Sequence, residues 1–249
     1  MSTDPLAMLF REFHLPTMAS RFAEMIQTAE AENWGYRSLL LRLCEAEGAD
    51  RRERKRERLL RESGLPSGKT LGNLEEAQLP PKVRRQLPTL LEGGFTERGE
   101  NLLVFGLPGR GKTHFLCALG RELILRRGCP IYFTPTFKLV QQLLAAKKDL
   151  RLSSVLKKLD RFEAVILDDL GYVQQSREEM EVLFTFLAER YERRSVWISS
   201  NLVFSKWDQI FKDPMTTMAA VDRLVHHAII LEFNGESLRT PREKDKGGS

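Results

Sequence analysis

Long apolar runs, paired cysteines and an apolar N-terminal segment are all missing from this sequence, and each absence excludes a class of protein. No stretch approaches the roughly 18 uncharged apolar residues that a membrane-spanning helix needs. Asp4, Arg11 and Glu12 interrupt the first residues, which therefore differ from a secretory signal peptide. The three cysteines form no close pair, and an odd number argues against a secreted disulfide framework. We therefore expect a cytoplasmic protein without a membrane partner.

The remaining composition fits a folded globular chain. Its 249 residues are 42% hydrophobic and 29% charged, which is too much apolar side chain for an intrinsically disordered protein. A chain of this length can bury one large core and still carry a smaller appendage. We therefore expect one main domain and one small domain.

Charge is distributed unevenly along the chain. Residues 1–50 hold four arginines against eight acidic residues, whereas residues 51–98 hold twelve basic residues against seven acidic ones. The most basic run can contact DNA phosphates, but Glu53 and Glu57 within it are also spaced for ion pairs along a solvated helix face. The candidate DNA-binding residues of this run are Arg51, Arg52, Arg54, Lys55, Arg56 and Arg58. A second candidate patch, for which ordinary surface lysines are the alternative, comprises Lys147, Lys148, Lys157 and Lys158.

Apolar residues recur at helical spacing near the N-terminus and predict a small all-α domain. Pro16 and the Trp34-Gly35 pair mark the expected breaks between its helices. The proline-containing stretch that follows is interpreted as a linker with a bridging helix that ends near Gly93. We expect residues 1–63 to form an N-terminal helical domain that binds DNA or assembles, and residues 64–98 to form a linker with its helix. The main domain is expected at residues 99–240 and a flexible tail at residues 241–249.

From about residue 101, short apolar runs alternate with longer amphipathic stretches. Such runs are typical of strands buried on both faces, and the stretches between them of helices. This alternation predicts an α/β fold in which helices flank a parallel sheet. The expected strands are 102–105, 130–134, 164–167, 196–199 and 229–233. The expected helices are 113–127, 137–146, 177–193 and 215–226.

The segment between the first expected strand and helix matches the phosphate-binding pattern G-x-x-x-x-G-K-[ST] in full. Its glycines allow backbone N–H groups to surround a phosphate, and the next helix directs its positive end at the same anion. We expect Lys112 to reach the β- and γ-phosphates of ATP and Thr113 to bind Mg²⁺. A glycine-rich turn could match by chance, but it would lack this strand and helix. The predicted nucleotide-binding residues are Gly106, Leu107, Pro108, Gly109, Arg110, Gly111, Lys112, Thr113 and His114.

Polar residues end the third and fourth expected strands. Asp168 has the position of the acid that holds Mg²⁺ in P-loop ATPases. Asp169 stands where many ATPases have a glutamate that orients the attacking water, although its side chain is one methylene shorter. Asn201 is predicted to contact the γ-phosphate or that water. A solvated acidic turn and a helix cap are the respective alternatives.

The order of these motifs, together with further stretches, is similar to that of a known family. The chain resembles the IstB-type helper ATPases of transposition, a branch of the AAA+ superfamily close to the DnaC-type helicase loaders. The Asp-Arg-Leu-Val-His-His stretch that follows Phe-Ser-Lys-Trp is the most specific part of this resemblance, which spans nearly the whole chain. The matching stretches are 64–71, 106–114, 167–172, 176–179, 189–193, 199–202, 204–207, 221–227 and 235–239.

The resemblance also implies roles for two arginines. Arg223 would be an arginine finger that reaches the ATP of a neighbouring subunit and stabilises charge on its γ-phosphate. Without the resemblance, an arginine paired with Asp222 on a helix surface would be expected. Arg239 would sense the nucleotide, and a solvated arginine is the alternative. Arg110 departs from the small or β-branched residue that is common at its position in the family.

Few other residues suggest chemistry. His226 and His227 are adjacent, so on a helix their side chains would point about 100° apart and would be poor joint metal ligands. Cys44, Cys117 and Cys129 are expected to be core thiols. The sequence shows neither zinc-type spacing nor a nucleophile–base–acid triad.

These features predict an ATPase that uses ATP and Mg²⁺. The resemblance implies that ATP joins copies into a ring or helical homo-oligomer, which binds double-stranded DNA and presents it to a partner transposase. Hydrolysis would then release or remodel the assembly. A helicase loader that binds single-stranded DNA is the alternative. A small-molecule kinase would need a substrate pocket and an arginine-rich lid, and the sequence indicates neither.

Overall fold

The computed structural model describes residues 4–74, 79–171, 176–202, 206–207 and 214–234. Contacts between residues divide the chain into two compact units, residues 1–58 and 59–249. Among the helices of the described ranges, none combines the length and the apolar character that crossing a bilayer requires. The first unit is all-α, and the second contains the sheet.

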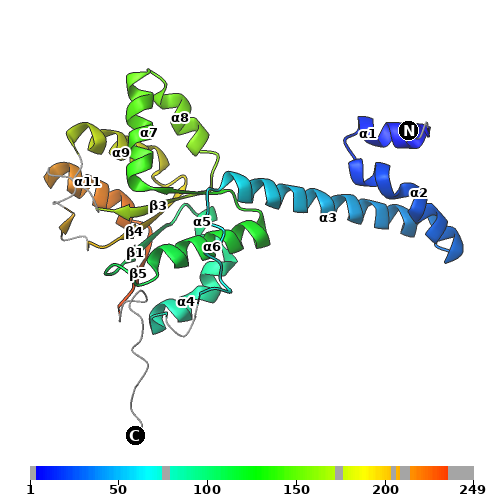
Figure 1. The fold of residues 1–249 in the computed structure, drawn as a ribbon, viewed down its shortest axis with the longest axis horizontal. Helices are drawn as coiled ribbons and strands as arrows, with labels where there is room; N and C mark the ends of the chain where they lie inside the picture. Colours follow the sequence, from blue (N-terminus) through cyan, green and yellow to red (C-terminus); the bar gives the residue numbers. More distant parts are fainter. Residues whose placement is uncertain (1–3, 75–78, 172–175, 203–205, 208–213, 235–249) are drawn as a thin grey trace, which may run out of the picture. The chain divides into compact units, whose positions relative to one another are not determined.

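Two short helices and most of a long one form the first unit (Figure 1). α1 (Pro5–Glu12) and α2 (Pro16–Ala31) each begin at a proline, which suits the first helical turn because an N–H would have no helical partner there. α3 (Tyr36–Glu62) is a single helix of 27 residues that carries the basic run. The core of this unit is small, and its buried apolar residues are Ala7, Phe22 and Leu43.

A buried carboxylate joins α2 to α3. Glu47 on α3 accepts hydrogen bonds from the backbone N–H groups of Thr17 at 2.8 Å and Met18 at 3.2 Å. It thereby caps the N-terminus of α2, where Leu15 offers no side-chain acceptor, and the positive end of the helix dipole stabilises its charge. The guanidinium of Arg54 lies 3.2 Å from Glu47 Oε1 and 3.3 Å from Thr17 Oγ1. Charged contacts therefore hold these two helices together.

The second unit is built on a five-stranded sheet in which every pairing is parallel. The strands lie in the order β2-β3-β4-β1-β5. Their bounds are β1 Asn101–Phe105, β2 Ile131–Pro135, β3 Ala164–Leu170, β4 Ser195–Ser200 and β5 Ala228–Glu232. Because parallel strands end at the same edge, the residues that follow β1, β4 and β3 meet there side by side.

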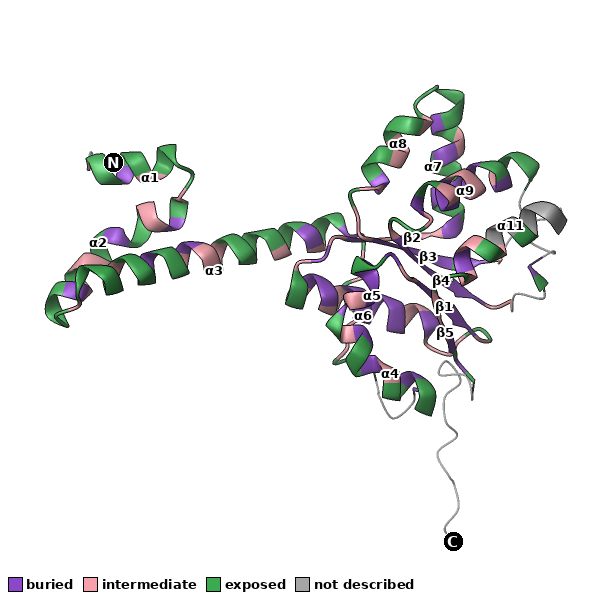
Figure 2. Ribbon diagram, turned by 180° about the vertical axis from the view of Figure 1, so that it is seen from behind, coloured by how far each residue is buried: buried purple, intermediate pink, exposed green. Residues whose placement is uncertain are grey.

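Helices cover both faces of this sheet, and the strands between them are buried (Figure 2). Alternate residues of β1 point to opposite faces: Leu102 and Val104 pack in the core with α6, whereas Leu103 packs in the core with α7 and α9. The helices on the first face are α4 (Pro81–Glu92), α5 (Gly94–Glu97) and α6 (Lys112–Arg127). Those on the second face are α7 (Thr136–Lys148), α8 (Leu152–Leu159), α9 (Arg177–Arg190) and α11 (Pro214–Val225).

The segment between α3 and α4 belongs to the second unit and packs against its sheet and α6. The carbonyl of Ser63 accepts a hydrogen bond from the Phe133 N–H of β2 at 2.7 Å. Leu74 is buried in the core that contains α6. On α6 itself, Arg121 donates to the carbonyl of Pro66 at 3.3 Å. These contacts fix residues 63–74 beside α6.

The predicted α/β fold, with a parallel sheet between helices and a helical N-terminal region, is confirmed. Within the expected linker, residues 64–98, α4 ends at Glu92 and is followed by Gly93, whose φ of 71° is the left-handed conformation that glycine favours at a helix end. The sequence analysis does not identify α8, although Leu152, Val155 and Leu159 have helical spacing. A helix of eight residues gives too short a periodic signal to separate it from a loop.

Candidate nucleotide site

The chain between β1 and α6 forms a loop whose path depends on glycine. At Gly106, where φ is 150°, a Cβ would lie only 2.5 Å from the carbonyl oxygen of Phe233. Gly111 has a left-handed φ of 83° immediately before α6 begins at Lys112, and side chains are disfavoured in that conformation. The first N–H groups of a helix have no partner within it. The loop therefore leads directly to a set of backbone donors that can bind an anion.

Lys112 is buried, and its ammonium group is held among oxygen atoms. Nζ donates to the carbonyls of Gly106 at 2.6 Å and Leu107 at 3.0 Å, and to Oδ1 of Asn201 at 2.6 Å. Asn201 follows β4, the strand beside β1, which explains how a residue 89 positions later reaches the loop. The structure thus brings together the lysine and the amide that the sequence assigns to the γ-phosphate.

Asp168, near the end of β3, accepts two hydroxyl hydrogen bonds at one oxygen. Its Oδ1 lies 2.8 Å from Thr113 Oγ1 in the first turn of α6 and 2.6 Å from Ser199 Oγ on β4. Only 9% of Asp168 is exposed, and a buried carboxylate needs such donors. Three elements of the fold therefore meet at this carboxylate.

The oxygen atoms around Asp168 suit Mg²⁺. This cation prefers oxygen ligands and usually takes one or two protein groups together with water and phosphate oxygens. The 2.8 Å between Thr113 Oγ1 and Asp168 Oδ1 is close to the roughly 2.9 Å between adjacent ligands in an octahedral Mg²⁺ site. The two residues expected to hold the metal are thus in contact.

β3 is irregular where its two acidic residues occur. The pairing with β4 shifts register between Leu167 and Leu170, and Asp169 has a φ of 56°. A bulge of this kind redirects a side chain, and aspartate is one of the few residues that tolerate the conformation. The N–H of Asp169 donates to Ser199 Oγ at 2.9 Å. The side chain of Asp169 is exposed to the cavity that the phosphate loop lines.

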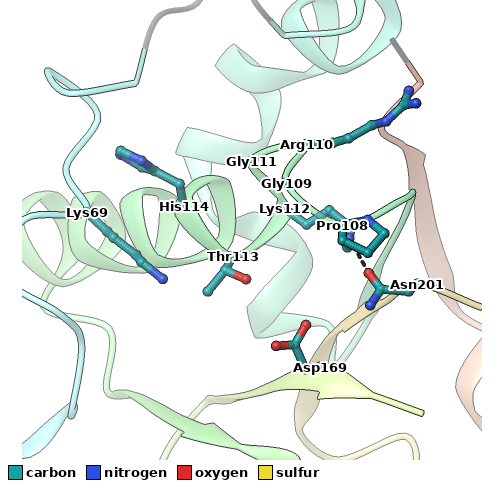
Figure 3. Close-up of a pocket in the computed structure, with 10 residues that line it drawn as sticks. All are labelled: Lys69, Pro108, Gly109, Arg110, Gly111, Lys112, Thr113, His114, Asp169 and Asn201. Carbon is teal, nitrogen blue, oxygen red and sulfur yellow. Dashed lines mark hydrogen bonds between the residues drawn. The ribbon is translucent and has the colours of Figure 1, made fainter. Parts of the chain in front are cut away.

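Lys112, Thr113, Asp169 and Asn201 line one cavity of about 280 Å³. Figure 3 shows Lys112 in contact with Asn201, and Arg110 extending away from the side on which Lys69 lies. Nε of Arg110 is buried and has no hydrogen-bond partner within the described ranges. The cavity is lined by Lys69, Pro108, Gly109, Arg110, Gly111, Lys112, Thr113, His114, Asp169 and Asn201.

Lys69 is a lining residue that the sequence analysis does not identify. It comes from the segment between α3 and α4, and its ammonium group points toward Thr113 (Figure 3). The backbone beside it is held in place because the carbonyl oxygen of Thr70 lies 2.9 Å from His114 Nε2. It lies in the stretch 64–71 that resembles the family, but no role was expected for it there, and its position depends on the path of residues 63–74 beside α6. Lys69 brings a second ammonium group to the cavity.

Arg223, on α11, lies away from the phosphate loop of its own chain. The carbonyl of Leu224, the next residue, accepts a hydrogen bond from Asn101 Nδ2 at 3.0 Å. Asn101 begins β1, so this contact lies at the opposite end of that strand from the phosphate loop. The guanidinium of Arg223 lies over the Phe184 ring, with Cζ 4.5 Å from the ring centroid. Nη1 is buried without a hydrogen-bond partner in the described part of the chain, where no ion pair with Asp222 occurs either.

The basic run on α3 divides into two groups. Arg51 donates to the carbonyl of His14 at 3.1 Å, and Arg54 pairs with the carboxylate that caps α2. Arg56 pairs with Glu53 at 3.3 Å. The exposed members that have no hydrogen bond or ion pair to any described residue are Arg52, Lys55 and Arg58. We call these three the basic stripe, because their spacing of three residues places them along one side of the helix.

The remaining basic candidates belong to the second unit. Lys147 at the end of α7 pairs with Glu181 of α9 at 2.9 Å, and this hydrogen bond lowers the pKa of the Glu181 carboxyl below its usual value. Arg239 lies outside the described residues. The exposed lysines that pair with no acidic residue of the described ranges are Lys148, Lys157 and Lys158.

His226 and His227 share an acidic neighbour, contrary to the expectation from helical spacing. α11 ends at Val225, so both histidines lie in the turn that follows and the angular spacing of a helix does not apply to them. His226 Nδ1 and His227 Nε2 each lie 3.8 Å from Oε1 of Glu192. The two side chains therefore face a common point.

Comparison with known proteins finds relatives over almost the whole chain. The family model described as IstB-like ATP binding protein matches residues 8–246. An insertion sequence ATP-binding protein of Sinorhizobium fredii is 41% identical over 235 residues, which cover 94% of this chain and 78% of the relative. The insertion sequence IS21 ATP-binding protein of Pseudomonas aeruginosa is 33% identical over 98% of this chain and 91% of the relative.

Solved structures share the fold at low sequence identity. The DnaC helicase loader has a TM-score of 0.55 and 18% identity, over 61% of this chain and 89% of that chain. The replication initiator DnaA bound to AMPPCP and single-stranded DNA has a TM-score of 0.58 and 18% identity, over 71% of this chain and 53% of that chain. These likenesses concern the fold alone, and they agree with the expected architecture.

Proposed function

Because this chain belongs to the family of IstB-like ATP binding proteins, we propose that it is the ATP-hydrolysing helper of an insertion sequence and acts together with a transposase. The name of its relatives, insertion sequence ATP-binding proteins, supports this context. The observation that carries the chemical part is the convergence of Lys112, Asn201 and Asp168 at one edge of the sheet. Each of these groups has a role in phosphoryl transfer.

ATP binds with its triphosphate in the loop between β1 and α6. Lys112 exchanges its contacts with the loop carbonyls for contacts with the β- and γ-phosphates, and the N-terminal N–H groups of α6 bind the same oxygens. Thr113 and Asp168 hold Mg²⁺, which supplies positive charge that neutralises the phosphate oxygens. Lys69, Arg110 and Lys112 line the cavity, and their positive charges favour a triphosphate.

Hydrolysis places water between Asp169 and the γ-phosphate. The water oxygen bonds to the γ-phosphorus, the bond from that phosphorus to the bridging β–γ oxygen breaks, and Asp169 accepts the proton of the water. Asn201, beside Lys112, orients the γ-phosphate. The exposed position of Asp169 at the bulge supports this role, because it places the shorter carboxylate at the cavity.

Arg223 completes the site of a neighbouring copy. Two observations support this: it lies at the opposite end of β1 from its own phosphate loop, and its Nη1 lacks a hydrogen-bond partner in the described part of the chain. A guanidinium supplied by a second subunit stabilises the charge on the γ-phosphate only after assembly. Hydrolysis is thereby coupled to oligomerisation.

Mixing two inactive variants tests the shared site. Arg223→Ala retains an intact nucleotide cavity, and Lys112→Ala retains Arg223, so each alone lacks turnover. In a mixture, a Lys112→Ala copy can supply its Arg223 to the intact nucleotide cavity of a neighbouring Arg223→Ala copy. That cavity is then a complete site, and phosphate release is expected to return. A mixture that stays as inactive as its components, although both variants are folded and oligomeric, contradicts the proposal.

The oligomer binds duplex DNA through the basic stripe and presents it to the transposase. The stripe supports this part because its side chains are exposed and make no ion pair with other described residues. Gel filtration and filter binding test it: a non-hydrolysable ATP analogue should increase both the size of the oligomer and the affinity for duplex DNA. Unchanged size and affinity contradict it. Preference for single-stranded DNA, with binding to a replicative helicase, would instead indicate a helicase loader.

A further inference from the structure

Three ligand-type side chains gather at a place that the nucleotide chemistry does not use. Glu192 lies in the turn after α9, and His226 and His227 lie in the turn between α11 and β5. One ligand atom from each of the three residues lies within 4.8 Å of the other two. The two imidazole rings are 4.3 Å apart between centroids. These groups come from two separate segments and converge only in the folded chain.

One residue, Asn101 at the start of β1, links the segment that carries the two histidines to the strand that follows the Glu192 turn. Its N–H donates to the carbonyl of His227 at 2.7 Å, and its side-chain Nδ2 donates to the carbonyl of Leu224 at 3.0 Å. Its Oδ1 accepts from the N–H of Val196 at 2.8 Å, at the start of the strand that follows Glu192. The ligand-bearing turns are therefore held at a set separation, while the side chains themselves remain more than half exposed.

We propose that Glu192, His226 and His227 bind a divalent transition metal ion, with Zn²⁺ as the best match. Two imidazoles and one carboxylate are a donor set that zinc takes in sites where water fills the fourth position. Ligand atoms of a tetrahedral zinc ion lie about 3.4 Å apart. The present distances of 3.8 Å from Oε1 to each histidine nitrogen need only a small side-chain adjustment.

These donor atoms do not suit Mg²⁺, the cation expected at the nucleotide site. Imidazole suits Zn²⁺, Ni²⁺ and Cu²⁺, whereas Mg²⁺ requires oxygen ligands in octahedral geometry. The two sites are also separated in space, because β1 runs from Asn101 to Phe105 and five strand residues span about 16 Å. Metal binding at this cluster is therefore measurable without nucleotide, and it does not depend on the proposed ATPase.

Tyr191 provides an internal comparison. Its hydroxyl lies 3.1 Å from His226 Nδ1, the nitrogen that faces Glu192. A metal ion bound to this nitrogen uses the lone pair that can otherwise accept a hydrogen bond from the tyrosine hydroxyl. Tyr191 therefore competes with the metal for His226 Nδ1. Removal of the hydroxyl should leave zinc affinity equal or higher.

Isothermal titration of the full, EDTA-treated chain with ZnCl₂ tests the proposal. We expect one zinc ion per chain at this cluster, an affinity at least about tenfold weaker in His226→Ala, His227→Ala and Glu192→Gln, and no loss in Tyr191→Phe. Millimolar Mg²⁺ should not compete. His14→Asn, which removes an exposed histidine of the helical unit, is the matched control and should bind zinc as the unaltered chain does.

Cobalt distinguishes this site from the cysteines. Co²⁺ bound by imidazole and carboxylate gives visible absorption without a thiolate charge-transfer band, and that is the expected spectrum. Absence of zinc binding in the micromolar range would overturn the proposal. Binding that survives all three ligand substitutions, or a cobalt spectrum with a thiolate band, would overturn it as well, because the metal would then be bound elsewhere.

Discussion

The helical unit and the sheet-containing unit use charged side chains in different ways. In the sheet-containing unit, Asp168 is buried and receives hydroxyl groups from two other elements, so that the polar residues specify a site. In the helical unit the apolar core is small, and the buried Glu47 acts as a structural cap for a neighbouring helix. The carboxylate of Asp168 thus supports a site, whereas that of Glu47 supports packing between helices.

This difference shows that a basic run cannot be treated as one surface. Arg54 belongs to the network that holds α2 to α3, whereas Arg52, two residues away, has no partner among the described residues. Substitutions that remove both together would mix unfolding with the loss of nucleic-acid contacts. Single substitutions and chemical labelling can separate the two uses of charge.

The two units should differ most in the rate at which their cysteines are alkylated. Burial raises the pKa of the Cys117 thiol on α6 to about 12, and only the thiolate reacts with alkylating agents. Cys44 in the helical unit is exposed, so it is not the core thiol expected from the sequence. At pH 8 we expect iodoacetamide to modify Cys44 at least about 1,000-fold faster than Cys117, as followed by peptide mass spectrometry.

The pH dependence provides the check. Because the raised pKa keeps Cys117 protonated, its labelling in the folded chain should accelerate as pH rises and should stay below that of Cys44 until the chain unfolds in urea. Equal labelling of the two cysteines at pH 8 in a folded, ATP-binding preparation would show that the core around α6 opens as readily as the helical unit.

The second prediction concerns catalysis alone. Asp169→Asn removes the group that accepts the proton while it keeps the side-chain shape, so ATP hydrolysis should fall by about 100-fold or more. Binding of a fluorescent ATP analogue should remain within about threefold of the original, because Lys112 and the phosphate loop are unchanged. A variant that loses binding to the same extent as hydrolysis would place Asp169 in nucleotide binding instead.

The nucleotide site was largely predictable because its main parts are local in sequence. The phosphate loop joins a strand directly to a helix, and Asp168 and Asn201 end two further strands, so their meeting follows from parallel strand order. Lys69 could not be placed in this way, since its position at the cavity depends on how residues 63–74 cross α6. The stretch 64–71 resembles the family, but a resemblance does not indicate which side chain of a linker reaches the cavity.

The helical unit shows the same limit in a different form. The sequence indicates helices and a basic run, and both are present. It does not indicate which arginines are engaged, because that depends on the contact between α2 and α3 at Glu47. The meeting of Glu192 with His226 and His227 was missed for a related reason: the helix ends one residue earlier than predicted, which places both histidines in a turn.

The third prediction tests the unforeseen member of the cavity. Lys69→Ala removes an ammonium group beside the triphosphate, and affinity for ATP should fall by about tenfold, since a partly exposed charge is screened by solvent. Lys69→Arg should retain much of the affinity. The control is Lys82→Ala, which removes an exposed lysine of α4 that does not line the cavity. An equal loss of ATP affinity in both alanine variants would show that Lys69 acts only through the net charge of the protein.

The smallest effects separate the two groups of basic residues on α3. Arg54→Ala removes the partner of a buried carboxylate, so the free energy of unfolding should fall by about 1 kcal/mol, as urea denaturation would measure. The triple variant Arg52→Ala, Lys55→Ala and Arg58→Ala should keep its stability, because these exposed side chains make no hydrogen bond or ion pair with other described residues.

Duplex binding should respond in the opposite way. If each residue of the basic stripe neutralises one phosphate, the triple variant reduces the slope of log affinity against log salt by about 2.7, at roughly 0.9 per contact. Arg54→Ala should leave that slope unchanged under conditions in which the helical unit of the variant is folded. A slope that changes with Arg54 but not with the stripe would reverse the assignment, and would mean that the capping network opens when the chain binds DNA.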